Sequence, residues 1–157
     1  MRRFDRISPV QFEKDFNDAS LYDTIQKPTR STKKSAGYDI RAVGDYVIEP
    51  GEVAKIPTGL KVAMEDDEVF LMFIRSSIAT KFGITLTNNV GVIDADYYNN
   101  EDNEGHFWLV LRNEGKEAFH IKNGDRLAQG IFVDYKITDD DNADSDRVGG
   151  FGSTGKE

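Results

Sequence analysis

The sequence contains no cysteine and only two histidines, His106 and His120, among its 157 residues. A chain without cysteine has no disulfide framework, no thiolate zinc site and no cysteine nucleophile, which agrees with a reducing, cytoplasmic location. Two histidines at this spacing supply neither a helical HExxH pair nor a three-histidine cage. Any metal is therefore expected to be a hard cation held by oxygen ligands.

Long apolar runs are also absent. The longest, Val69–Ile74, has six residues, which is far too short to span a membrane and suits a buried strand. Near the N-terminus, Asp5 and Arg6 stand where a secretion signal needs an apolar run. The sequence therefore predicts neither a membrane segment nor export.

Positive charge is in deficit, with 20 Lys and Arg against 28 Asp and Glu and a formal net charge of −8. Such a surface repels polyanions, so broad nucleic-acid binding is excluded. Ten Phe, six Tyr and a hydrophobic content of 38% distinguish the chain from disordered acidic proteins. The length fits a single folded domain.

Turn residues interrupt the sequence at short intervals, for example at Ser35–Gly37, Pro57–Gly59, Asn113–Gly115 and Asn123–Asp125. Apolar and β-branched segments lie between them: 46–48, 53–56, 69–74, 107–111 and 130–133. Short strands at this spacing predict an all-β protein, a jelly-roll-like sandwich or barrel.

Two short segments have helical features. The first is 9–18, where Pro9 opens a turn and Phe12 and Phe16 share a face. The second is Ser76–Phe82, a short helix that a serine is expected to cap and Gly83 to end.

The segment Asp134–Asp146 carries six aspartates and one lysine. Like charges repel, so we interpret it as a solvated linker rather than a cation site. A glycine-rich stretch, Gly149–Gly155, follows it. We therefore divide the chain into a β domain, residues 1–137, and an acidic linker with a glycine-rich arm, residues 138–157.

Five segments, taken in order, resemble the five motifs of the trimeric deoxyuridine triphosphate nucleotidohydrolases (dUTPases). They are Ala36–Ile40, Arg75–Ile78, Asn88–Tyr97, Gly124–Gln129 and Arg147 with Gly149–Gly155. Each motif alone is a weak signal, whereas five in order with compatible spacing are specific. The resemblance implies a jelly-roll homotrimer whose C-terminal arm is swapped onto a neighbour. Each active site would take its third motif from one chain, motifs one, two and four from a second and the arm from the third.

The resemblance implies hydrolysis of dUTP to dUMP and pyrophosphate, with Asp94 as the general base that activates water for attack on the α-phosphorus. Asp39 would organise Mg²⁺ through its water shell. Arg75, Ser76, Gln129 and Arg147 would hold the triphosphate.

Selection of the base would rest on the hairpin Asn88–Val92, with the Asn88 amide reading the uracil edge and Gly91, Val92 and Ile93 lining the base. Tyr97 would pack on the deoxyribose and exclude a 2′-hydroxyl, and Phe151 would stack on uracil. The same match assigns substrate contacts to Gly152, Ser153 and Thr154 of the arm. Ser77 stands where many members have Gly, and we expect it to cap the helix rather than bind phosphate.

Residues 94–106 depart from the family pattern. As a continuing strand, they would direct Asp94 and Asp96 to one face and Tyr97 to the other. The family usually continues Asp-Tyr-Arg-Gly, whereas this chain has Tyr98-Asn99-Asn100 and then an apparent insertion at 101–106. This longer hairpin leaves a second protein partner open.

Two rival functions remain. The related dCTP deaminases need a proton-shuttling glutamate where this chain has Val110, so deamination is disfavoured. A nucleotide-binding module without catalysis would keep the trimer, but no expected catalytic residue is missing.

Overall fold

The computed structural model describes residues 1–150. Its strands are β1 (Arg3–Arg6), β2 (Thr29–Arg30), β3 (Tyr38–Arg41), β4 (Tyr46–Ile48), β5 (Val53–Ala63), β6 (Glu68–Ile74), β7 (Ile84–Leu86), β8 (Gly91–Asp94), β9 (Phe107–Asn113), β10 (Phe119–Ile121) and β11 (Arg126–Asp134). Its helices are α1 (Pro9–Asp15) and α2 (Ser76–Phe82), with 3₁₀ turns η1 (Ala19–Thr24) and η2 (Ala95–Tyr97). The predicted all-β class is confirmed.

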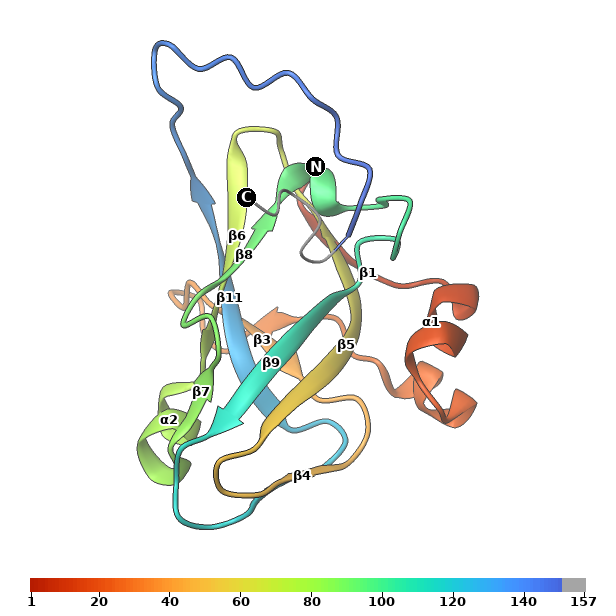
Figure 1. Cartoon of the computed structure of the whole chain (residues 1–157), viewed down its shortest axis with the longest axis vertical. Coiled ribbons are helices and arrows are strands. Elements are labelled where there is room, and N and C mark those ends of the chain that lie inside the picture. Colours follow the sequence, from red (N-terminus) through yellow and green to blue (C-terminus); the bar gives the residue numbers. More distant parts are fainter. Residues whose placement is uncertain (151–157) are drawn as a thin grey trace.

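The strands form two main antiparallel sheets. One has the order β1-β5-β9-β7 and the other β2-β3-β11-β6-β8, while β4 and β10 form a small pair. The two sheets face each other across the core (Figure 1). Phe70 of β6 is fully buried and contacts Phe107 of β9 and Phe4 of β1. The alternating burial along β6 shows that its other face points away from this core.

A glycine in β11 makes this packing possible. A Cβ placed on Gly130 would lie 2.0 Å from the ring of Phe70. The absence of a side chain therefore lets the Phe70 ring lie directly against the β11 backbone.

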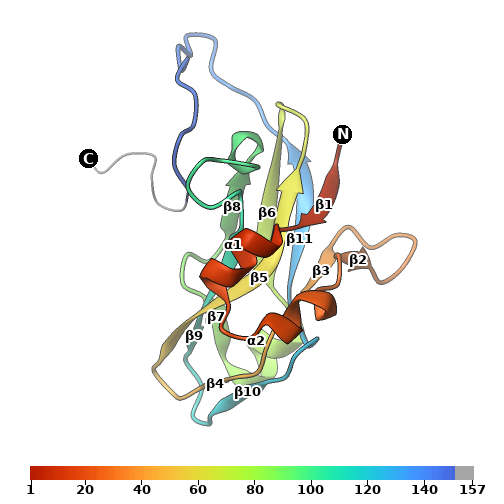
Figure 2. The same ribbon diagram turned by 90° about the vertical axis from the view of Figure 1, so that its right-hand side faces the viewer.

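The helices begin and end for different reasons. In α1, the Ser8 side chain accepts a hydrogen bond from the Gln11 N–H, and Pro9 occupies the first turn. The predicted contact between Phe12 and Phe16 is confirmed, with ring centroids 4.2 Å apart. The helix and η1 cover one side of the molecule beside β5 (Figure 2).

The predicted serine cap of α2 is wrong. Arg75 is the N-cap residue and makes no side-chain capping bond, while Ser76 and Ser77 already lie in the first turn. The predicted end is confirmed, because Gly83 adopts φ 69° at the C-cap, a conformation that favours glycine. Among residues 1–150, no helix is long and apolar enough to cross a membrane.

Residues Pro57–Gly59 do not form the predicted turn. They lie within β5, where the pairing with β9 shifts register between Pro57 and Leu60. The Thr58 hydroxyl donates to the Phe107 carbonyl, and the Gly59 N–H donates to His106 Nε2. Side-chain hydrogen bonds thus replace part of the strand ladder, so proline and glycine are accommodated in a bulge.

The strand predicted through Asp96 also ends earlier. β8 stops at Asp94, and Ala95–Tyr97 form the 3₁₀ turn η2. Residues 135–150 follow β11 without further strands (Figure 1). The predicted arm residues Phe151, Gly152, Ser153 and Thr154 lie outside the described residues.

Candidate active site

The third motif forms one wall of a cavity of about 190 Å³. β8 pairs with β6, which places Gly91 opposite Met72 and Asp94 opposite Val69. A Cβ on Gly91 would lie 2.7 Å from the Met72 Cε, so glycine at this position lets the end of the Met72 side chain pack directly against β8. Ile93 is buried, whereas Val92 and Asp94 on the same strand are exposed.

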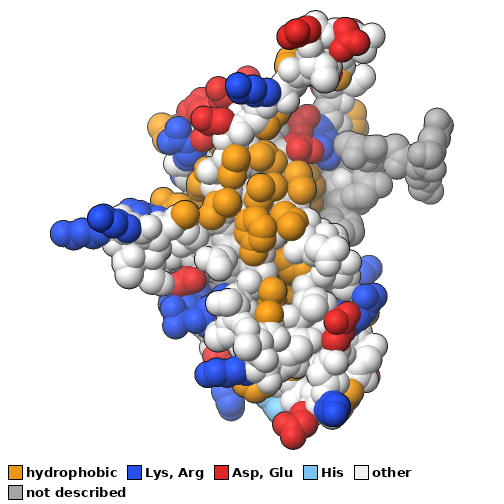
Figure 3. Space-filling view, turned by 90° about the vertical axis from the view of Figure 1, so that its left-hand side faces the viewer, with side chains coloured by type: hydrophobic (Ala, Val, Ile, Leu, Met, Phe, Trp, Pro, Cys, Tyr) orange, Lys and Arg blue, Asp and Glu red, His pale blue; other side chains and the backbone are white. Residues whose placement is uncertain are grey.

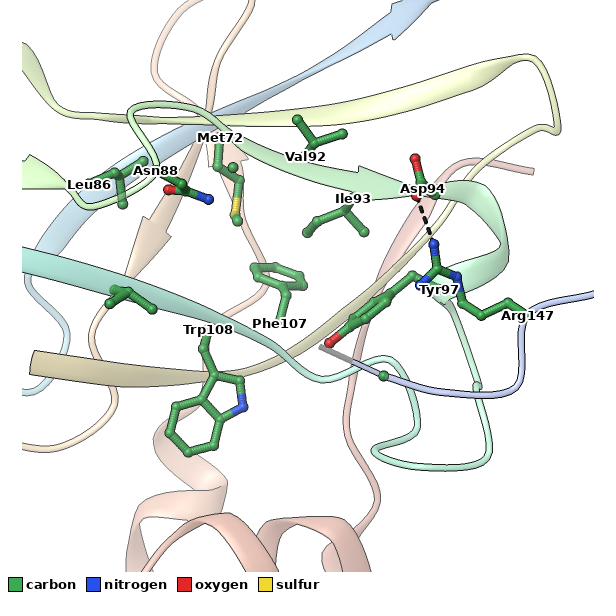
Figure 4. Close-up of a pocket in the computed structure, with 13 residues that line it drawn as sticks. Met72, Leu86, Asn88, Val92, Ile93, Asp94, Tyr97, Phe107, Trp108 and Arg147 are labelled. Atoms are coloured by element: carbon green, nitrogen blue, oxygen red, sulfur yellow. Dashed lines mark hydrogen bonds and ion pairs between the residues drawn. The ribbon is translucent and has the colours of Figure 1, made fainter. Parts of the chain in front are cut away.

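The cavity brings together most of the predicted third-motif residues (Figure 4). Asn88, Gly91, Val92, Ile93, Asp94, Tyr97, Arg147 and Gly150 all line it. Phe107 and Met72 add apolar surface from the neighbouring strands. The result is a small apolar recess with a carboxylate at one end and an amide at the other.

Arg147 returns from the linker to this cavity. Its Nη2 lies 2.7 Å from Asp94 Oδ2 and its Nε lies 2.7 Å from Asp96 Oδ1. The guanidinium also lies 5.7 Å from the centroid of the Tyr97 ring. Its side chain is only 10% exposed. In this arrangement Arg147 contacts carboxylates of its own chain, and its predicted contact with phosphate stays a prediction.

Tyr97 is buried beneath this ion pair. Burial raises the pKa of its hydroxyl, while a hydrogen bond from Asn103 opposes that shift. The residues that follow do not form the longer hairpin that the sequence predicts. They make a compact turn in which Asn100 is buried and the Asn99 N–H donates to the Glu104 carbonyl.

The turn is tied to the N-terminal part of the chain. Glu104 accepts hydrogen bonds from the backbone and hydroxyl of Ser8 and from Lys61. His106 is fully buried, with Nδ1 2.6 Å from Asp15 Oδ2 and Nε2 accepting from the Gly59 N–H. Burial lowers the pKa of His106, so the ring is neutral at pH 7.

The His106 ring lies beside two other aromatic rings. Its centroid is 5.9 Å from that of Phe16 and 5.3 Å from that of Trp108. Sequence reasoning treated residues 101–106 as an insertion and missed this buried contact. The only available signal was a lone histidine at the start of an apolar strand.

The first and fourth motifs meet elsewhere, on β3 and β11. Asp39 pairs in register with Gln129. A Cβ on Gly37 would lie 2.3 Å from Gln129 Oε1, so glycine at this position lets the Gln129 amide lie directly against the backbone of the first motif. The Asp39 carboxylate accepts from the Ser31 hydroxyl at 3.1 Å and lies 3.4 Å from Arg126 Nη1.

The second motif lines another pocket, of about 460 Å³, that includes Arg75 and Ser77. Three further cations line the same pocket: Arg41, Lys81 and Arg126. Sequence reasoning missed these three, although Arg126 lies inside the fourth motif. Ser76 is exposed at the start of α2 and Gln129 is half-buried, and neither lines this pocket.

The two groups of residues are far apart in one chain. Asp39 lies on β3 and Asp94 on β8, three strand spacings away, or about 14 Å. Gln129, the partner of Asp39, is opposite Phe73, whereas Asp94 is opposite Val69, which adds about 13 Å along the strands. The combined separation of about 19 Å prevents both carboxylates of one chain from reaching the same phosphorus atom.

The dUTPase family model matches residues 23–155, and a deoxyuridine 5'-triphosphate nucleotidohydrolase of Lactococcus lactis is 50% identical over 133 residues. That alignment covers 83% of this chain and 89% of the relative. The chain belongs to the dUTPase family. The resemblance carried by the five motifs, and the enzyme class that it predicted, are confirmed.

Solved structures agree with this dUTPase membership. The crystal structure of dUTPase from Streptococcus mutans superposes with a TM-score of 0.74 at 36% identity, covering 87% of this chain and 98% of that chain. A mutant dUTPase from phage phi11 of S. aureus, described as coordinating a structural Mg(II) ion, superposes with a TM-score of 0.70 at 21% identity. It covers 92% of this chain and 97% of its own, and at this identity it supports the fold alone.

Proposed function

We propose that this dUTPase hydrolyses dUTP to dUMP and pyrophosphate, with Asp94 as the general base that takes a proton from the attacking water. Family membership supports the overall reaction. The position of Asp94 supports its role, because an exposed carboxylate at the mouth of an apolar recess can reach a water molecule beside a bound nucleotide. In-line attack at the α-phosphorus would release pyrophosphate as the leaving group.

We propose that three chains assemble to complete each site. The separation between Asp94 and the Asp39–Gln129 group supports the contribution of a second chain, and the third chain would supply its C-terminal arm. The outer face of the five-stranded sheet is apolar, as the centre of Figure 3 shows. Val69, Leu71, Phe73, Val92, Ile131 and Val133 lie on this face by the alternation of their strands.

The two residue groups border the same face. Asp94 lies at one edge on β8, and Gln129 and Asp39 lie toward the other on β11 and β3. A second copy packed on this face would bury its apolar surface. It would also bring Asp94 of one chain toward the Asp39 group of another. The occupant that we propose for this face is therefore a second copy of the same chain.

The triphosphate would bind at the cationic pocket of the second motif. The Arg75 guanidinium can form bidentate hydrogen bonds to phosphate oxygens, and Ser76 is exposed at the start of α2. Arg41, Lys81 and Arg126 add positive charge there. Because these cations are local, a net charge of −8 does not oppose binding of a small polyanion.

The residues present fit Mg²⁺ as a cofactor. Residues 1–150 hold no group of three or more His, Asp or Glu side chains that could form a protein cage for a metal. Asp39 offers one carboxylate, only 13% exposed, and Mg²⁺ is commonly held by one or two carboxylates together with substrate phosphates and waters. When bound, Mg²⁺ would neutralise charge on the phosphates.

The recess of the third motif would hold the deoxyuridine. Its small volume and its apolar walls of Ile93, Met72 and Phe107 suit a pyrimidine ring, and the Asn88 amide can read the polar edge. Tyr97 would pack on the sugar and leave no room for a 2′-hydroxyl.

Arg147 would leave Asp94 when substrate binds. In the structure it occupies the carboxylate that must accept a proton. A triphosphate carries more negative charge than the two aspartates and would compete for the guanidinium. We propose that Arg147 then contacts phosphate and that the arm closes over the site of a neighbouring chain. The absence of cysteine supports a cytoplasmic location for this reaction.

Pyrophosphate release from dUTP, dCTP, dTTP and UTP, assayed in parallel with Mg²⁺, tests the proposed reaction. We expect turnover of dUTP almost alone. Ammonia released from dCTP would instead indicate a deaminase, which Val110, an apolar residue of the recess, argues against. Binding without turnover would indicate a module that lacks catalysis.

The Asp94→Asn variant tests the general base. We expect turnover to fall about 10³-fold while nucleotide binding persists, because the amide keeps the shape but cannot accept the proton. Asp66→Asn, at an exposed turn, is the matched control and should retain activity. Undiminished turnover of Asp94→Asn would remove Asp94 as the base.

Complementation between variants tests the shared site. Asp94→Asn and Arg75→Ala should each be inactive, but chains refolded together should recover activity. If each site takes Asp94 from one chain and Arg75 from another, random mixing of equal amounts leaves about a quarter of the sites intact. No recovery in the mixture would show that one chain supplies both residues.

A further inference from the structure

The turn at residues 98–105 is held by two asparagine side chains. Asn100 Nδ2 donates to the Tyr97 carbonyl and to Asn103 Oδ1, both at 2.8 Å. Asn100 Oδ1 accepts from the N–H groups of Asp102 and Asn103 at 3.0 Å. These contacts make a closed amide network directly after η2.

Asn103 extends this network to the Tyr97 hydroxyl. Its Oδ1 accepts from Asn100 Nδ2 and from the Gly105 N–H, which fixes the orientation of the amide. Its Nδ2 therefore points the other way and donates to Tyr97 Oη at 2.8 Å. The Tyr97 hydroxyl in turn donates to the His106 carbonyl at 3.1 Å. The Tyr97 hydroxyl thus accepts one hydrogen bond from the turn and donates another to the residue that follows it.

We propose that Asn103 is a positioning residue that fixes the Tyr97 ring and thereby sets selection of deoxyribonucleotides over ribonucleotides. The inference rests on the proposed packing of Tyr97 on the sugar. A ring held at one edge by packing and at its hydroxyl by two hydrogen bonds cannot tilt away from the sugar. Without the Asn103 bond, a small tilt opens room for a 2′-hydroxyl. Displacements of about 1 Å in an active site are enough to change rates by large factors.

The turn has other anchors, so the hydrogen bond can be removed without unfolding it. Glu104 binds Ser8 and Lys61, and Lys61 Nζ also donates to Asn99 Oδ1. The Asn100 contacts to the Tyr97 carbonyl and the Asp102 N–H do not involve Asn103. Leucine at position 103 keeps a similar volume and removes the polar contacts.

The experiment compares kcat/KM for dUTP and UTP in the full-length protein and in the variants Asn103→Leu, Tyr97→Phe and the double variant. We expect the dUTP-to-UTP ratio to fall about tenfold in each single variant, the usual effect of one lost hydrogen bond. The double variant should lose no more than the worse single variant, because both remove the same bond. Glu101→Ala, an exposed residue of the same turn, is the matched control and should keep the wild-type ratio.

A purely structural role predicts a different result. Asn103→Leu would then lower the thermal midpoint and change both substrates equally, and a ratio within twofold of wild type would overturn the proposal. Calorimetric affinities for dUMP and UMP give a second readout that does not need catalysis. If the wild-type protein hydrolyses no nucleotide, the proposed function fails, and the dUMP-to-UMP affinity ratio still decides the role of Asn103. Equal affinities for the two in the wild type would overturn it.

Discussion

The buried histidine makes the stability of this protein depend on pH in a defined direction. In the native state, His106 Nε2 accepts from the Gly59 N–H, so a proton added there would face another donor. Burial lowers the native pKa of His106 below the ordinary value of 6.5. In the unfolded chain the ring takes up a proton near pH 6.5. Between these two pKa values the unfolded state binds more protons than the native state, so stability rises with pH.

A difference of one bound proton between the unfolded and native states changes the free energy of unfolding by at most about 1.4 kcal/mol per pH unit. We therefore expect stability to be fully present above pH 6.5 and to fall as the pH drops through the native pKa of His106. Urea unfolding of the wild type at one protein concentration, from pH 5.0 to 7.5, measures this slope. His106→Gln cannot take up the proton, so it should be less stable at pH 7.5 but should lose the dependence between pH 5.0 and 6.5.

The only other histidine provides the control. His120 is exposed on β10, so His120→Gln should retain the wild-type slope. If the ion pair with Asp15 outweighed the effect of burial, the native state would favour the charged His106 ring. The stability of the protein would then increase as the pH falls. Two results would refute the reasoning: a wild-type free energy of unfolding that increases as the pH is lowered from 6.5 to 5.0, or the same pH dependence in His106→Gln as in the wild type.

Two other predictions follow from close contacts. Gly130→Ala places a methyl group 2.0 Å from the Phe70 ring, so we expect a loss of about 3 kcal/mol in urea unfolding, which Phe70→Leu in the same chain should partly restore. Additive losses in the double variant would contradict the clash. Asp96→Asn removes one of two carboxylates that hold Arg147, so trypsin should cleave after Arg147 several-fold faster, since an ion pair of this kind contributes up to about 1 kcal/mol. Cleavage after the exposed Lys136 is the internal control, and equal rates after Arg147 would mean that Asp96 does not hold the arm.

Much of the fold could be predicted from the sequence because the strands are short, apolar and bounded by turns. β6 and β9 are found where their apolar runs predict them. The segment Pro57–Gly59 could not be predicted, because its turn residues are accommodated by hydrogen bonds that they donate to residues about 50 positions away. The secondary-structure propensity of a short segment carries no information about such distant partners.

The candidate site could be predicted only in part for a similar reason. The motif match named Asp94 and Gln129 as candidate site residues, and the structure adds that they lie in separate groups. It did not identify Arg41, which no motif contains. Nor did it identify His106 and Asn103, because an apparent insertion gave no reason to expect buried hydrogen bonds within it.

The neighbour of His106 has a practical consequence. Trp108 is the only tryptophan in the chain, and its ring centroid is 5.3 Å from that of His106. Its emission therefore comes from one small region, where β9 meets the segment that carries Phe16. Because Trp108 itself lies on β9, its emission reports both the release of the segment that carries Phe16 and the melting of that sheet.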